Sequence, residues 1–164
     1  MKILIQLFFL IPIIVAFKDN EVIGKVGLKA IEKFSGIDHE GVEFEKTYYI
    51  TQYLTTTPIN ARSACKSYSS AMDLASFESR EEFLKIRPKL SAEIRDKPVI
   101  VGGFLHGDEY RWMSSGLKID FRYDPSKGKN CLGLQKEGAI GYVPLTCNEE
   151  YLFICQKLEF HYSN

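Results

Sequence analysis

The sequence predicts an α+β domain with antiparallel sheet, because its helical segments come first and most of its strands follow. Residues 58–87 hold two amphipathic helical segments, whereas residues 97–157 hold short β-branched or aromatic runs separated by turn-forming residues. Helices followed by a series of strands favour an α+β domain over a repeated βαβ fold. The 164 residues are enough for one domain.

Residues 1–16 have the layout of a secretory signal peptide. Lys2 precedes a mostly apolar run, interrupted by Gln6, and the small residue Ala16 stands just before polar sequence. A membrane anchor is the alternative interpretation, but the run has about fourteen residues and a bilayer needs roughly twenty. We therefore expect cleavage near Ala16, a secreted extracellular protein, and no membrane span in the mature chain.

Residues 17–46 are polar and charged, and we expect them to form an N-terminal leader that is mobile or loosely packed. Ile23, Val26, Ala30 and Phe34 have helical spacing, so a short oligomerising helix is the alternative. Glycines at 24 and 27 oppose a stable helix. We assign the folded domain to residues 47–158 and a short tail to residues 159–164.

The domain begins with a predicted strand, "TYYITQYL" at 47–54, and two predicted helices. The first helix starts with Thr57 as N-cap and Pro58 at the first position, and it should bury one face: Ala61, Ala64, Cys65, Tyr68 and Met72. The second starts at a capping box of Ser79 and Glu82, and Pro88 should end or kink it near Arg87. Further strands are expected, of which the run at 73–77 is a short one: 73–77, 97–105, 109–113, 119–123, 131–135, 139–143 and 151–157.

The cysteine count and the charge limit the functional class. Four cysteines in an exported chain indicate two disulfides, although spacing alone does not choose among the three pairings. Without residues 1–16 the chain has 20 basic and 21 acidic residues, which gives no basic surface for nucleic acid or an anionic membrane. Neither a nucleophile–base set nor a metal-binding spacing is present, so we expect no enzyme.

From about Tyr48 to Lys157 the sequence resembles the C-type lectin-like domain family, in particular short secreted lectins of the insect type. The stretch "NARSACKSYSSAMDLASFESREEF" resembles the family's first-helix motif, and "VGGFLHGDEYRWMSSG" resembles its central motif with Trp112 and Gly116. "NCLGL" and "YLFIC" resemble its cysteine-bearing strands. The resemblance implies two helices packed on antiparallel sheets, a long loop region, and two disulfides, Cys65–Cys155 and Cys131–Cys147.

The resemblance also identifies where sugar-binding members hold calcium, and this chain departs from those positions. Calcium takes six to eight oxygen ligands. The related triplet here is Asp124-Pro125-Ser126, Lys129 stands where an acid is expected, and the Trp-Asn-Asp positions become Tyr142-Val143-Pro144. We therefore expect no cofactor and no calcium at the usual sugar site. If any ion binds, Asp124 and Asn130 are the candidates, with a serine hydroxyl and backbone carbonyls.

A second calcium position of the family is also altered. A glutamate follows the final cysteine in some members, whereas Gln156 stands here. Glu78, Glu81 and Glu82 are interpreted as the solvated start of a helix, where negative charge is favoured.

The resemblance implies a recognition module, and two hypotheses remain. The first is carbohydrate binding, galactose-type or calcium-independent, in extracellular recognition or innate immunity. The second is a calcium-independent protein-binding or heterodimerising module, for example in reproductive secretions. The ligand would thus be a glycan or a protein, the oligomeric state is open, and the candidate contact residues lie near the long loop: Arg122, Tyr123, Asp124, Ser126, Lys129, Asn130 and Tyr142.

Overall fold

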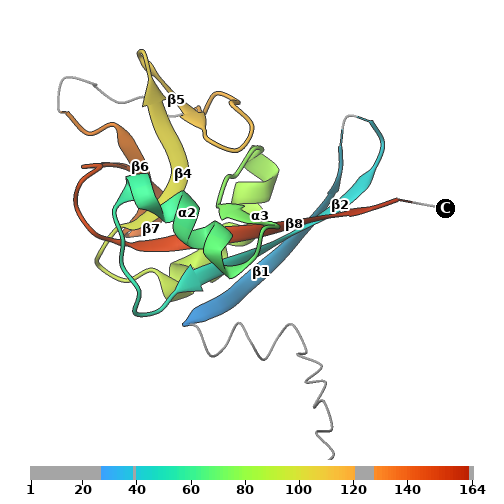
Figure 1. Cartoon of the computed structure of the whole chain (residues 1–164), viewed down its shortest axis with the longest axis horizontal. Helices are drawn as coiled ribbons and strands as arrows, with labels where there is room; N and C mark the ends of the chain where they lie inside the picture. The colour runs from blue at the N-terminus through green and yellow to red at the C-terminus, as the bar shows by residue number, and fades with distance from the viewer. Residues whose placement is uncertain (1–26, 39, 121–127, 163–164) are drawn as a thin grey trace, which may run out of the picture.

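The computed structural model describes residues 27–38, 40–120 and 128–162, which form two helices and eight strands (Figure 1). The helices are α2 (Pro58–Tyr68) and α3 (Arg80–Glu93). The strands are β1 (Leu28–Ile37), β2 (Glu43–Thr51), β3 (Met72–Leu74), β4 (Val99–His106), β5 (Glu109–Trp112), β6 (Cys131–Glu137), β7 (Ala139–Leu145) and β8 (Leu152–His161). The predicted α+β class is confirmed.

The strands form one sheet in the order β1-β2-β8-β4-β6-β7, with β3 paired to β8 and β5 paired to β4. Every pair is antiparallel except β4 and β8, which run parallel over Val99–Ile100 and Leu152–Phe153. The last strand therefore lies at the centre of the sheet. Of the predicted strand at 119–123, Ile119 and Asp120 lie outside regular strands, and the remaining positions are outside the described residues.

Helix α2 begins as expected and ends earlier than expected. Thr57 is the N-cap, its carbonyl accepts the N–H groups of Asn60 and Ala61 at 2.9 and 3.0 Å, and Pro58 is the first helical residue. Ala61 and Cys65 form the buried face. Ser69 is extended, at φ −163° and ψ 143°, so the helix stops at Tyr68 and Met72 begins β3.

Helix α3 has the predicted capping box, but it does not end near Arg87, which is the first of the two effects expected of Pro88. Ser79 and Glu82 make both hydrogen bonds of the box, and the helix runs to Glu93 with Pro88 inside it. Ile86 and Leu90 are buried one turn apart, so packing on both sides of Pro88 holds the helical path. Pro88 itself is exposed, which lets water hydrate the carbonyl that its missing N–H leaves without a partner.

Replacing Pro88 by alanine is expected to raise the free energy of unfolding by about 2 kcal/mol. A proline in a helix interior costs about 3 kcal/mol relative to alanine, and the greater freedom of the unfolded alanine chain offsets up to about 1 kcal/mol of that. Urea denaturation of the two proteins measures the difference. A control, Lys89→Ala, changes a neighbouring exposed residue and should shift stability by less than about 0.5 kcal/mol.

The expectation of a loosely packed or helical leader is wrong for the described part of residues 17–46. Residues 28–37 form β1, which pairs with β2 from Leu28↔Thr51 to Ile37↔Glu43. The alternation of Phe44, Lys46, Tyr48 and Ile50 continues N-terminally from the predicted strand, so β2 starts before Thr47. Of the apolar residues whose spacing suggests a helix, Ala30 and Phe34 lie in this strand, which has an irregularity between Ala30 and Glu32. Residues 1–26, which include the expected signal peptide, lie outside the described residues.

The β1–β2 hairpin and the end of β8 form an arm that projects from the body (Figure 1). β8 pairs with β2 from Ile154↔Ile50 to His161↔Glu43, so residues 159–161 of the expected tail belong to the sheet. In the described part of the chain, no helix is long and apolar enough to span a bilayer.

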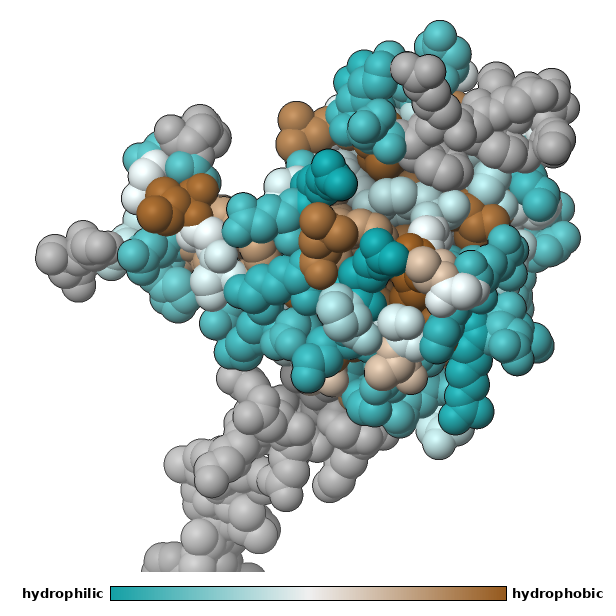
Figure 2. All heavy atoms as spheres, turned by 180° about the vertical axis from the view of Figure 1, so that it is seen from behind, coloured by the Kyte–Doolittle hydropathy of each residue, from teal (hydrophilic) through white to brown (hydrophobic). Residues whose placement is uncertain are grey.

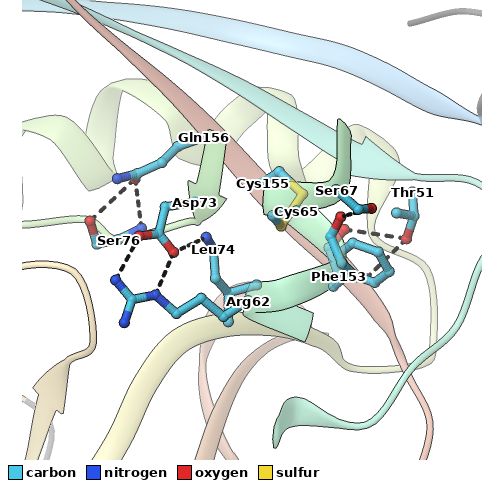
Figure 3. The surroundings of a disulfide bond; sticks show 11 residues. Thr51, Arg62, Cys65, Ser67, Asp73, Leu74, Ser76, Phe153, Cys155 and Gln156 are labelled. Carbon is cyan, nitrogen blue, oxygen red and sulfur yellow. Dashed lines mark hydrogen bonds and ion pairs between the residues drawn. A yellow bond between two sulfur atoms is a disulfide. The ribbon is translucent and has the colours of Figure 1, made fainter. Parts of the chain in front are cut away.

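The two disulfides have the pairing that the resemblance implies. Cys65–Cys155 joins α2 to β8, and Cys131–Cys147 joins the start of β6 to the segment after β7. Figure 3 shows the first bridge buried between the Arg62–Asp73 ion pair, at 2.8 Å, and the contact of Thr51 with the backbone of Phe153. The bridge thus fixes α2 against the centre of the sheet.

Candidate ligand-binding site

The predicted contact residues are only partly within the described structure. Arg122, Tyr123, Asp124 and Ser126 lie outside the described residues. Lys129 and Asn130 are exposed immediately before β6, and Tyr142 is half-buried within β7.

The backbone of Lys129 and Asn130 is held by the β4–β5 hairpin. The Tyr110 hydroxyl donates to the Lys129 carbonyl at 2.5 Å, and the Leu105 N–H donates to the Asn130 carbonyl at 2.8 Å. Two of the backbone oxygens that could have coordinated a calcium ion therefore accept protein hydrogen bonds.

Tyr142 lies away from these two residues and packs into an aromatic cluster. Its ring stacks on Phe83 with centroids 5.1 Å apart and meets the edge of Trp112 at 6.0 Å. Tyr142 pairs with Leu134 of β6, which is four positions after Asn130 in the sequence. At about 3.3 Å per residue, Leu134 and Asn130 lie roughly 13 Å apart along the strand direction. The structure thus does not bring Tyr142 beside Asn130.

The positions where the family supplies an Asn-Asp pair hold apolar side chains in regular strand. Val143 pairs with Gly133 and Pro144 pairs with Leu132. A proline is tolerated here because β7 is an edge strand among the described residues, with no described strand on its outer side. Within the described residues no group of three or more His, Cys, Asp or Glu side chains could hold a metal ion.

Tyr142 lines an open cleft of about 360 Å³ between the start of α3, the segment after β5, and β7. The cleft has an aromatic floor: Phe77, Phe83, Trp112 and Tyr142. Phe77 and Trp112 are almost fully buried, so the accessible aromatic surface comes from the half-buried Phe83 and Tyr142. Burial, and then the charge of Glu82, raise the pKa of the Tyr142 phenol, which keeps it a neutral hydroxyl.

Charged side chains of both signs surround this floor: Glu78, Arg80, Lys118 and Asp120. Lys118 and Arg111 both form ion pairs with Glu109, and these pairs hold the segment after β5 against the hairpin. An aromatic floor with convergent donors and acceptors can hold a neutral polar ligand that also has an apolar face. We call this site the aromatic cleft.

A buried charged cluster lies directly behind the aromatic cleft, and here the expectation for Glu82 is wrong. The Lys46 ammonium lies 2.9 Å from Glu82 Oε1 and 3.2 Å from Glu78 Oε2, and the side chains of Lys46 and Glu82 are only 4% and 2% exposed. Tyr48 donates a hydrogen bond to Glu82, and burial, followed by the charge of Glu82, raises the pKa of its phenol. Glu82 is therefore a buried anion with a lysine counter-ion, whereas Glu81 is exposed as expected.

Gln156, which stands where some family members have a calcium-binding glutamate, is linked to the same cluster. Its Oε1 accepts the Ser76 N–H at 2.8 Å and lies 3.2 Å from Ser76 Oγ (Figure 3). Ser76 Oγ in turn lies 3.4 Å from Glu78 Oε1. The Lys46 ammonium group therefore supplies the positive charge of this cluster of oxygen atoms.

The sequence itself contains a signal for the burial of Lys46. Strand alternation places Phe44, Lys46, Tyr48 and Ile50 on one face, and three of these four are apolar or aromatic. A lysine on the core face of a strand needs a buried anion as its counter-ion. Glu82 can be that anion, because the capping box holds its side chain in a fixed position. The rim residues Arg80, Lys118 and Asp120 have no comparable signal, because only the fold brings α3 next to the segment after β5.

Comparisons with known proteins identify the fold. Neither a family model nor a curated protein matches the sequence. Among solved structures, the C-type lectin CEL-I from Cucumaria echinata is 18% identical, with a TM-score of 0.54 over 71% of this chain and 91% of that chain. The Ca²⁺-independent C-type lectin SPL-2 from Saxidomus purpuratus is 21% identical, with a TM-score of 0.55 over 68% and 85%.

A third structure is not named as a lectin. Ovocleidin-17, a major protein of the Gallus gallus eggshell calcified layer, is 20% identical, with a TM-score of 0.52 over 74% of this chain and 94% of that chain. At these identities the likeness concerns the backbone arrangement. Together with the two disulfides and the sheet order, it shows that this chain has the C-type lectin-like fold.

Proposed function

We propose that this protein is a secreted, extracellular recognition module that binds carbohydrate in the aromatic cleft without calcium. The observation that carries the proposal is the cleft itself, in which Phe83 and Tyr142 lie beneath a rim of both charge signs. Solved structures with the same fold include a calcium-independent lectin and the complex of SPL-1 with GlcNAc, which supports a sugar as the ligand class.

The chemistry of the cleft suits a sugar ring. The C–H face of a pyranose can lie on the accessible aromatic surface, while its hydroxyls donate to carboxylates and accept from cationic groups. Asp120 and Glu78 provide the acceptors, and Arg80 and Lys118 provide the donors. Hydrogen bonds to charged groups each contribute about 1.5–3 kcal/mol when they are well desolvated, and less at an exposed rim.

A calcium-free mode is supported by the residues at the family's calcium positions. Lys129 introduces a cation, Val143 and Pro144 offer no side-chain oxygen, and Lys46 already neutralises Glu78 and Glu82. An extracellular location is supported by the signal-peptide pattern of residues 1–16 and by the two disulfides.

Replacing Arg80 or Asp120 by alanine is expected to weaken glycan binding by about tenfold, because each change removes one rim hydrogen-bonding group worth about 1.4 kcal/mol. A glycan array, run with calcium and with EDTA, identifies the sugar, and titration calorimetry measures the affinities. Arg95→Ala and Asp96→Ala are matched controls, since both residues are exposed beside a different cleft at the end of α3.

The glycan array and the rim variants together distinguish three outcomes. Binding that is equal with calcium and with EDTA, and that falls in the two rim variants only, supports the proposal. Binding that requires calcium contradicts the metal-free mode. Glycan binding that is unchanged in both rim variants places the site elsewhere.

A protein-binding function is the second candidate, and one observation favours it. Phe104 of β4 is 42% exposed beside an open hollow that includes His106, Arg111 and Met113. Exposed aromatic and arginine side chains are typical of protein contacts. An array without glycan binding, together with a partner captured by the wild type but not by Phe104→Ser, supports this function instead.

A further inference from the structure

The outer edge of β8 is unpaired beyond Lys157. β3 covers this side of β8 only at three positions, from Leu74↔Cys155 to Met72↔Lys157. β2 covers the other side as far as His161. Residues Leu158–His161 therefore present one open strand side in the described part of the chain, at the arm of Figure 1, and Tyr162 follows directly after the strand. These five residues are here called the β8 edge.

The two faces of the β8 edge have different chemistry. Phe160 pairs with Phe44, and alternation places Leu158 and Phe160 on one face, where the ring of Tyr162 also lies against Phe160. Phe160 and Tyr162 are 44% and 74% exposed, and the centroids of their rings lie 6.3 Å apart. Glu159 and His161 lie on the opposite face, where Lys157 and Glu159 form an ion pair at 3.0 Å. In Figure 2 the arm projects from the body and carries hydrophobic side chains between hydrophilic ones.

The other two edges of the sheet carry features that oppose pairing with a further strand. β7 contains Pro144, which has no N–H to donate. β1 carries Lys29 and Lys33 and an irregularity between Ala30 and Glu32. Charged side chains, prolines and bulges are the common protections of edge strands. The β8 edge has no lysine or proline between Leu158 and Tyr162.

The β8 edge is also complementary to itself. In an antiparallel pairing centred on Phe160, each Phe160 faces Phe160 of a second copy, and Leu158 faces Tyr162. In the same register Glu159 faces His161, whose imidazole N–H can donate to the carboxylate. All five positions thus meet a compatible residue.

Symmetry restricts which registers are allowed. A two-fold axis normal to the sheet keeps each residue on the same face of the sheet in both copies. Two residues directly opposite each other also point to the same face, so their sequence numbers must differ by an even number. The register centred on Phe160 meets this condition. In β1, by contrast, the two registers centred on the middle of the strand place Glu32 opposite Glu32 or Lys33 opposite Lys33, and like charges directly opposite are destabilising.

We propose that two copies of this chain pair antiparallel through the β8 edge, with Phe160 at the two-fold axis. The sheets of the two arms then join into one continuous sheet, with a row of aromatic side chains on one face. The paired segment is short, so the dimer is a weak one, with a dissociation constant on the order of 10 μM.

Sedimentation equilibrium of the disulfide-intact chain tests the association, with Phe160→Lys as the disrupting variant. Two lysines facing each other at the axis should raise the dissociation constant at least about tenfold. Leu84→Lys is the control, since Leu84 is a large apolar residue of similar exposure, 47% against 44%, on α3. It should associate like the wild type.

Cysteine cross-linking tests the register independently of stability. In Phe160→Cys the two new thiols lie directly opposite each other, at a Cα separation of about 4.5–5.5 Å that a disulfide can bridge. A covalent dimer should form much faster than in the control Leu84→Cys. The proposal is overturned by a wild type that stays monomeric up to about 1 mM, by a dimer that persists in Phe160→Lys, or by equal cross-linking of the two cysteine variants.

Discussion

Replacing Cys65 and Cys155 together by alanine is expected to lower the free energy of unfolding by about 4.6 kcal/mol. The bridge closes a segment of 90 residues, and the chain-entropy relation gives this value for a loop of that length. Single domains have about 5–15 kcal/mol in total, so the variant retains little stability. The loss should appear as a lower urea midpoint, with a steeper slope because the unfolded chain without the cross-link exposes more surface.

The second disulfide provides the matched comparison. Cys131–Cys147 closes only 16 residues, for which the same relation gives about 3 kcal/mol. Its double alanine variant should therefore be the more stable of the two, with the β6–β7 pairing still in place. The reverse order would contradict the view that loop length decides the difference.

Replacing Lys46 by methionine is expected to lower the free energy of unfolding by about 3–5 kcal/mol, because the change leaves Glu82 buried without its counter-ion. Methionine preserves the length and apolar stem of lysine, so lost packing contributes little. Lys33→Met is the control. Lys33 pairs with Glu45 at 2.6 Å but is 61% exposed, and such pairs contribute about 0–1 kcal/mol.

A second change in the same cluster tests the explanation. Glu82→Gln removes the buried charge while leaving an acceptor for Tyr48 and a side chain that can complete the capping box. Adding it to Lys46→Met should recover most of the loss. A double variant as unstable as the sum of the two single variants would show that Lys46 and Glu82 are not coupled.

The sequence was sufficient for those elements whose signals are local. The capping box of Ser79 and Glu82 and the Thr57-Pro58 start both depend on side chains next to the helix end, and both occur. Pro88 and residues 28–37 are different. Burial of Ile86 and Leu90 on either side overrides the local effect of the proline, and pairing with β2 makes a strand of a segment whose apolar spacing is helical.

The site was less predictable because its residues come together only through the fold. Tyr142 lines the aromatic cleft, but Lys129 and Asn130 lie at the other end of the β6–β7 pair. Arg122, Tyr123, Asp124 and Ser126 remain predictions. The Lys46–Glu82 pair joins residues 36 positions apart, which no local motif connects.

The position of β8 has a consequence for biosynthesis. The last of the described strands in chain order, β8, lies between β2 and β4, and it carries one half of the longer disulfide. Until residues 152–161 leave the ribosome, β2 and β4 expose edges that could pair with other chains, and the two hydrophobic clusters lack Phe153 and Ile154. The domain therefore cannot complete its fold until β8 has left the ribosome, and its dependence on chaperones should be greatest just before that point.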